Sequence, residues 1–134
     1  ELVEENEEAA HLVTIGEERH HIIVPKEKLP RGRFGVGTVH HIAWSVTNDE
    51  VHREWQDFLY EEGYNVTEVK DRQYFKAIYL AEKGHVIFEL ATDGPGFMIN
   101  ETFEESGSKL MLPPQYEHMR SQLEQTLIPL REKE

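Results

Sequence analysis

Two short apolar stretches, VHHIAWSV at residues 39–46 and VIFELAT at residues 86–92, decide how this chain folds and where its chemistry lies. Each has the length and composition of a β-strand. Each also offers a candidate metal ligand among apolar neighbours, His41 in the first stretch and Glu89 in the second. Because His41 and Glu89 lie far apart in the sequence, only the fold can bring them together.

Side chains alternate between the two faces of a strand. This alternation groups His41 with the small residues Ala43 and Ser45, and it sets Glu89 beside Ala91. The opposite faces are bulkier and are expected to pack on a helix. If the two strands are neighbours in one sheet, the histidine and the carboxylate face the same concavity.

A carboxylate in so apolar a strand needs a partner, because an unpaired buried charge is costly. A divalent cation held by His41 and Glu89 is one candidate. The spacing alone leaves two others open. His41 could be a hydrogen-bonded histidine without a metal, and Glu89 could pair with Arg72 or Lys76.

Working outward from these strands, the pattern predicts the order β-α-β-β-β. The predicted strands span residues 38–46, 64–70, 73–81 and 85–92. Thr47 and Glu50 have the spacing of a capping box that opens the helix after the first strand. The helix carries an apolar stripe that is expected to be core, made of Val51, Trp55, Phe58 and Leu59. A last helix is predicted at about residues 115–127.

The part of the chain before residue 37 is expected to be separate. Residues 1–10 are acidic and predict a frayed or weakly helical segment. Residues 11–15 and 19–25 predict a β-hairpin, followed by a linker rich in Pro and Gly. The sequence therefore predicts an α+β protein with a leading part at residues 1–36 and a βαβββ module at residues 37–134. The first residue is Glu1 rather than Met, which suggests a fragment or a processed chain.

The composition excludes several classes of partner. The 134 residues carry a formal net charge of −12, which disfavours binding to nucleic acid. No apolar run approaches the ~20 residues of a membrane span, and no signal peptide is apparent. The absence of Cys restricts any metal site to His, Asp and Glu ligands. These features fit a cytoplasmic protein.

Four segments together carry a resemblance to a known family. They are residues 37–44 (GTVHHIAW), 71–79 (DRQYFKAIY), 88–97 (FELATDGPGF) and 109–114 (KLMLPP). The β-α-β-β-β order with these segments resembles the vicinal oxygen chelate, or glyoxalase, superfamily. Within it, the chain is similar to the C-terminal half of hydroquinone-specific, extradiol-like ring-cleaving dioxygenases. The similarity extends from about His11 to Leu130.

The resemblance implies roles for three residues. His41, which directly precedes Ile42-Ala43-Trp44, matches a metal-ligand histidine, and Glu89 matches the carboxylate ligand. Tyr79 resembles the tyrosine that bonds substrate or oxygen beside the metal, although an ordinary strand tyrosine remains an alternative. His40 is expected to lie on the opposite face.

The implied cofactor is Fe(II), with Mn(II), Zn(II) or Ni(II) possible, and the third protein ligand lies in a module absent from this chain. The implied substrates are a small phenolic ring and dioxygen. Either a homodimer or pairing with a missing N-terminal module would cover the open face of the sheet. Two alternatives use the same scaffold: a metal-dependent glyoxalase-type isomerase, and a non-enzymatic protein that binds small aromatic ligands.

Overall fold

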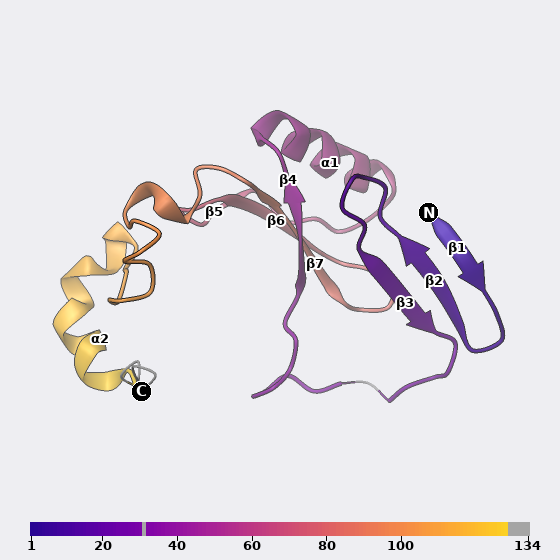
Figure 1. Ribbon diagram of the computed structural model, residues 1–134, viewed down its shortest axis with the longest axis horizontal. Helices are drawn as coiled ribbons and strands as arrows, with labels where there is room; N and C mark the ends of the chain where they lie inside the picture. Colours follow the sequence, from indigo (N-terminus) through magenta and orange to yellow (C-terminus); the bar gives the residue numbers. More distant parts are fainter. Residues whose placement is uncertain (31, 129–134) are drawn as a thin grey trace. The chain divides into compact units, whose positions relative to one another are not determined.

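The computed structural model describes residues 1–30 and 32–128 (Figure 1). The chain forms two compact units, Glu1–Thr38 and Val39–Glu134. The domain boundary expected after residue 36 lies beside this division.

The first unit is a three-stranded antiparallel sheet of β1 (Leu2–Glu5), β2 (Ala9–Val13) and β3 (His21–Pro25), in that order. The expected hairpin is present as β2 and β3. The expectation of a frayed or weakly helical acidic segment is wrong, because β1 pairs with β2. The side chain of Asn6 explains the reversal between them. Its Oδ1 accepts hydrogen bonds from the backbone N–H groups of Glu8 and Ala9, which fixes a tight turn.

The second unit contains a four-stranded sheet and the helix α1 (Asp49–Glu61). Its strands are β4 (Ile42–Val46), β5 (Lys70–Asp71), β6 (Lys76–Ala81) and β7 (Ile87–Thr92), in the spatial order β4-β7-β6-β5. The pair β4–β7 is parallel, and β7–β6 and β6–β5 are antiparallel. The expected α+β class and β-α-β-β-β order are therefore confirmed.

The strands are shorter than expected. Residues 64–69 are not a ladder strand, although the Thr67 N–H and hydroxyl bond the Tyr79 backbone on β6 at 3.0 and 3.1 Å. This side-chain link takes the place of one ladder hydrogen bond. The first strand begins only at Ile42, so His40 and His41 precede it.

The helix α1 begins at Asp49, and its N-cap is Asn48 rather than Thr47. The Asn48 Oδ1 accepts hydrogen bonds from the N–H groups of Glu50 and Val51, each at 3.0 Å. The expected Thr47 capping box is therefore wrong by one residue. Asn is a strong cap because its short side chain reaches the unpaired N–H groups of the first turn.

The cap makes a simple stability prediction. Asn48→Ala removes the partner of two backbone donors and is expected to destabilise the chain by about 1 kcal/mol. Thr47→Ala, at the position that the sequence pattern favours, is the matched control and should leave stability unchanged. Urea unfolding of both variants measures the difference. An equal loss of stability in the two would contradict the assignment.

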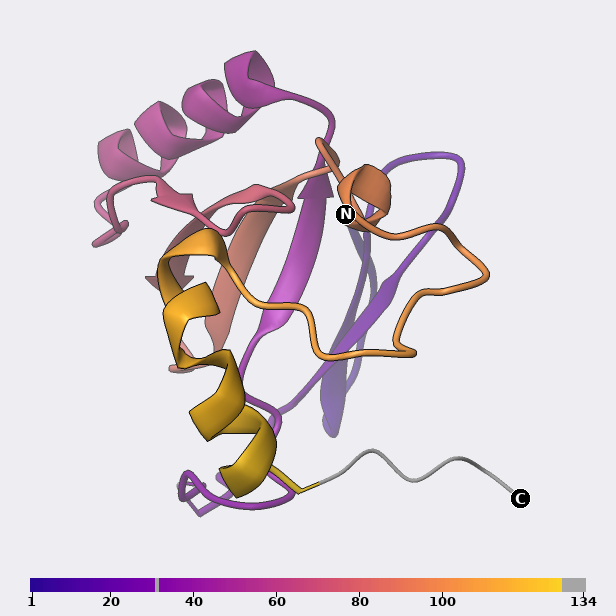
Figure 2. The ribbon, with the colours of Figure 1, turned by 90° about the vertical axis from the view of Figure 1, so that its left-hand side faces the viewer.

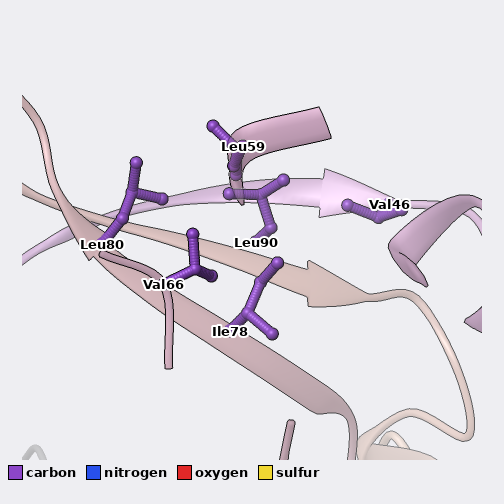
Figure 3. Close-up of a cluster of buried hydrophobic side chains, with 6 residues drawn as sticks. All are labelled: Val46, Leu59, Val66, Ile78, Leu80 and Leu90. Atoms are coloured by element: carbon purple, nitrogen blue, oxygen red, sulfur yellow. The ribbon is translucent and has the colours of Figure 1, made fainter. Parts of the chain in front are cut away.

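One face of the four-stranded sheet carries the core (Figure 3). Figure 3 shows six apolar side chains gathered between the strands and α1: Val46, Leu59, Val66, Ile78, Leu80 and Leu90. Ile78 is fully buried at 0% exposure. The bulky face of the sheet, which carries Val46 and Leu90, packs on the helix as expected.

The expected core stripe of the helix is wrong in part. Leu59 is buried, but Trp55 and Phe58 are 44% and 49% exposed and contact each other edge to face. The buried polar residue His52 takes the position next to the sheet, and its Nε2 donates to the Leu90 carbonyl at 3.0 Å. A pattern of apolar residues does not reveal a buried histidine.

After β7 the chain forms two 3₁₀ turns, at Phe97–Ile99 and Pro114–Met119, and the short helix α2 (Arg120–Thr126). The helix expected at residues 115–127 is therefore half 3₁₀. The helix α2 lies well away from α1 in both views (Figures 1 and 2). Within residues 1–30 and 32–128, no helix has the length and apolar character to span a membrane.

Candidate functional site

Glu89 lies in the middle of β7, the strand that β4 and β6 flank. The register pairs it with Ala43 on β4 and with Tyr79 on β6. Residues directly opposite in a sheet share a face, so Glu89, Ala43 and Tyr79 all lie on the side away from the core. Both Ala43 and Ser45 are exposed, so this face is open along β4.

His41, just before β4, reaches Glu89. Its Nε2 lies 2.7 Å from the Glu89 Oε2, and the two side chains are 36% and 4% exposed. The carboxylate is therefore buried while the histidine borders solvent. These two residues, distant in sequence, meet because β4 and β7 are adjacent parallel strands and His41 directly precedes β4.

Tyr79 completes a group of three side chains. Its hydroxyl donates to the Glu89 Oε1 at 2.6 Å, and its ring lies edge-on to the His41 ring at 6.2 Å. The two carboxylate oxygens are thus divided between a phenol and an imidazole. Lys76, one of the possible partners of Glu89, instead binds Asp49.

Arg72 contacts Tyr79. Its Nε donates to the Tyr79 hydroxyl at 3.3 Å, and its guanidinium lies 5.4 Å from the ring centroid. Burial raises the pKa of the Tyr79 phenol above its usual 10.0, the hydrogen bond to Glu89 raises it further, and Arg72 opposes the rise. Tyr79 therefore keeps its proton at neutral pH and can donate it.

The raised pKa of Tyr79 makes stability depend on alkaline pH. The unfolded chain releases this proton near pH 10 and the folded chain releases it higher, so the contribution is present below pH ~10 and is lost as pH rises through the folded pKa. Tyr79→Phe should flatten this fall. Arg72→Leu removes the opposing cation and should raise the pKa of Tyr79. Ultraviolet titration of the phenol, with Tyr79→Phe as the reference, measures the pKa of Tyr79. A lower pKa in Arg72→Leu would contradict the contact between Arg72 and Tyr79.

His40 was expected to face away from the site, and the structure differs. Its Nδ1 lies 2.8 Å from the Nδ1 of His41. The alternation rule does not apply because the strand begins only at Ile42. This contact holds the nitrogen of His41 that is turned away from Glu89, which orients the ring. Adjacency to His41 was the only sequence signal for His40, and Arg72 had none beyond its charge.

Two groups of aromatic side chains lie near the sheet, one on its core side and one at its end. Trp44 contacts Phe88 edge to face at 5.7 Å on the core side. Phe97 stacks on Tyr74 at 4.8 Å and meets Phe75 at 6.3 Å, at the end of the sheet where β7 stops.

The donor set of His41 and Glu89 fits a divalent cation of the first transition series, which accepts imidazole nitrogen and carboxylate oxygen. Two neighbouring ligands at about 2.1 Å from one ion lie about 3 Å apart. The observed 2.7 Å between the His41 Nε2 and the Glu89 Oε2 is short of that by a few tenths of an ångström. Within the described residues, no group of three His, Cys, Asp or Glu is positioned to hold a metal, so the fit is to two ligands of a larger set.

No family model matches the chain. Several individual proteins match it in sequence. The chain is 54% identical over 104 residues to the "Putative ring-cleaving dioxygenase MhqO" of Bacillus subtilis, across 78% of this chain and 33% of that protein. It is 34% identical over 97 residues to the "Chlorohydroquinone/hydroquinone 1,2-dioxygenase" of Sphingobium indicum, across 70% of this chain and 29% of that protein. The chain thus spans about one third of the length of these curated relatives.

A solved structure extends the comparison to the fold. A crystal structure named as a putative dioxygenase from Bacillus subtilis matches 98% of this chain and 42% of that chain, with a TM-score of 0.91 and 45% identity. Agreement at this level covers both units and is consistent with the glyoxalase-type βαβββ module. By sequence and by fold, the chain belongs to the family of proteins that are named ring-cleaving dioxygenases.

Proposed function

We propose that the chain supplies His41 and Glu89 as two protein ligands of a mononuclear ferrous centre in a dioxygenase that cleaves a small phenolic ring. The third protein ligand comes from outside the described residues. The substrate class is a hydroquinone or a catechol-like phenol, as the name of the Sphingobium indicum relative suggests.

One observation carries the proposal. A carboxylate that is 4% exposed has an imidazole at 2.7 Å and a phenol at 2.6 Å as its side-chain partners, on the open face of the sheet. Burying a carboxylate is costly, and these two partners are neutral unless His41 is protonated. A divalent cation between His41 and Glu89 would offset the cost of burying this carboxylate.

Each residue then has a task. His41 presents Nε2 to the cation while His40 restrains its other ring nitrogen. Glu89 provides the negative charge, and its burial keeps it from rotating into water. Tyr79 holds a proton on its hydroxyl beside the carboxylate, where it can serve a bound phenol or oxygen. The exposed Ala43 leaves room above the sheet for a flat ring.

A ferrous ion, when bound, would supply adjacent open positions and redox chemistry for an electron-rich ring and dioxygen. The protein around it would orient the ring and exclude water. Because the described residues offer two ligands, we propose that a second copy of the chain, or another part of a longer protein, lies against the open face. Light scattering at high protein concentration tests the first arrangement.

The test of function uses MhqO in which the segment matching this chain has been exchanged for it. The 54% identity makes a folded hybrid a reasonable expectation. After anaerobic Fe(II) loading, the hybrid should consume dioxygen with hydroquinone and lose this activity in Glu89→Gln. Unmodified MhqO is the positive control. A folded, iron-loaded hybrid that consumes no dioxygen while MhqO does would overturn the proposal.

The same assay distinguishes the dioxygenase from the two alternative functions of this fold. A glyoxalase-type isomerase would work without dioxygen and with Zn(II) or Ni(II). A binding protein would take up the phenol without any metal.

A further inference from the structure

We infer that His11 and His21 form a second site for a late transition-metal dication, on the three-stranded sheet of the first unit. This site lies within residues 1–38, and it does not depend on the function proposed for the site at Glu89.

The two imidazoles are held together by the register of the hairpin. β2 and β3 pair His11 with Ile23 and Val13 with His21, so the two histidines are diagonal neighbours on one face of the sheet. The Nε2 of His11 lies 2.8 Å from the Nδ1 of His21, and the ring centroids are 5.0 Å apart with an interplanar angle of 28°. Two ring nitrogens from different strands are thus directed at one another.

A metal ion can take the place of the hydrogen bond between these two rings. At 2.8 Å one nitrogen donates N–H and the other accepts it, and when the donor ring carries its proton on its other nitrogen instead, both facing nitrogens present a lone pair. Neutral imidazole nitrogen is the commonest metal ligand in proteins. Coordination at about 2.0–2.1 Å from each nitrogen needs a wider separation, and His21 is exposed and has space to turn.

The neighbouring strand favours a cation at this point. The register sets Glu4 of β1 opposite His11, on the same face of the sheet. The Glu4 carboxylate is exposed and bonded only weakly to the Asn6 side-chain amide, at 3.3 Å. It therefore adds negative charge beside the two nitrogens, and water can fill the remaining positions of the ion.

The donor type selects the ion. Imidazole suits Ni(II), Cu(II) and Zn(II), whereas Mg(II) and Ca(II) take oxygen ligands. The affinity of nitrogen ligands rises from Fe(II) to Ni(II) and Cu(II). The pair should therefore bind Ni(II) and not Mg(II). A metal here also joins β2 to β3 and stabilises the folded hairpin by mass action.

The experiment titrates Ni(II) into the full chain carrying both His41→Gln and Glu89→Gln, which removes the first site and its His40–His41 ring pair, and follows binding by calorimetry. The expected result is one equivalent of Ni(II) bound and none of Mg(II). In this background His11→Gln and His21→Gln should each weaken binding at least tenfold, since even the loss of an outer hydrogen-bond partner of a metal ligand costs about 10–100-fold. His118→Gln, which removes an exposed histidine elsewhere, is the matched control.

His21→Gln preserves a hydrogen-bonding side chain next to His11, so the hairpin is expected to remain folded by circular dichroism. A second readout needs no further variant. Paramagnetic Ni(II) at less than one equivalent should broaden the ring-proton signals of His11 and His21 before that of His118. The inference is overturned if the chain carrying His41→Gln and Glu89→Gln binds no Ni(II), if adding His21→Gln to it leaves the affinity unchanged, or if the signal of His118 broadens first.

Discussion

Replacing Glu89 by Gln is expected to abolish ferrous-ion binding by this chain, with a loss in affinity of more than about 100-fold. Gln keeps the size of the side chain and can still accept from the Tyr79 hydroxyl, but it removes the negative charge that faces His41. Changes to the outer partners of metal ligands already cost about 10–100-fold, and a direct ligand contributes more. Equilibrium dialysis under anaerobic conditions, followed by elemental analysis, measures the effect.

His41→Ala should have the same consequence, because Nε2 is the other donor. Glu104→Gln removes an exposed carboxylate elsewhere in the second unit and is the matched control. It should bind one ferrous ion as the unmodified chain does. If Glu89→Gln keeps the affinity of the control while remaining folded, Glu89 is not a ligand.

The second large effect is expected from Tyr79→Phe in the MhqO hybrid. At saturating Fe(II), the turnover of hydroquinone should fall by about 10²-fold or more, which is the range for loss of a positioned proton donor. The phenyl ring preserves the contact with His41, so only the hydroxyl bonded to Glu89 and Arg72 is lost. Dioxygen consumption under single-turnover and steady-state conditions measures the change.

Tyr116→Phe is the control for this variant, since Tyr116 is 51% exposed and lies in the second 3₁₀ turn. Iron content should be equal in both variants at saturation. Full turnover by Tyr79→Phe would assign the hydroxyl a structural role, as an ordinary strand tyrosine bonded to a buried carboxylate.

The central part of the fold follows from residue alternation. Ile78, Leu80 and Leu90 are bulky and lie on the core face, whereas Tyr79 and Glu89 lie between them in sequence and on the other face. This alternation depends only on strand geometry, and it therefore predicts which side chains share a surface. The place of Tyr79 beside His41 and Glu89 followed instead from the family resemblance of the sequence.

Other features depend on interactions that alternation does not encode. The ring of His40 reaches His41 because both precede the first hydrogen-bonded pair of β4. Arg72 reaches Tyr79 from the end of β5, across a loop in which Gln73 has a φ of 69°. Such contacts are set by loop conformation, and a pattern of residue types carries little information about it.

The helix and the N-terminal segment differ from expectation for separate reasons. The buried side of α1 includes His52, a polar residue whose hydrogen bond to Leu90 makes burial acceptable. Trp55 is left more exposed as a result. The strand β1 is exposed along its whole length, and it is held by backbone pairing with β2 rather than by side-chain burial. Composition alone therefore gave the wrong secondary structure for the N-terminal segment, whereas for α1 it misplaced only the buried side chains.

The most direct test of the account is an anomalous-difference map from crystals of this chain grown anaerobically with Fe(II). One peak is expected at about 2.0–2.2 Å from both the His41 Nε2 and the nearer oxygen of Glu89, with these two atoms farther apart than the 2.7 Å described above. A fully ordered site in which His41 and Glu89 remain hydrogen-bonded and no peak lies between them, at saturating Fe(II), would contradict it.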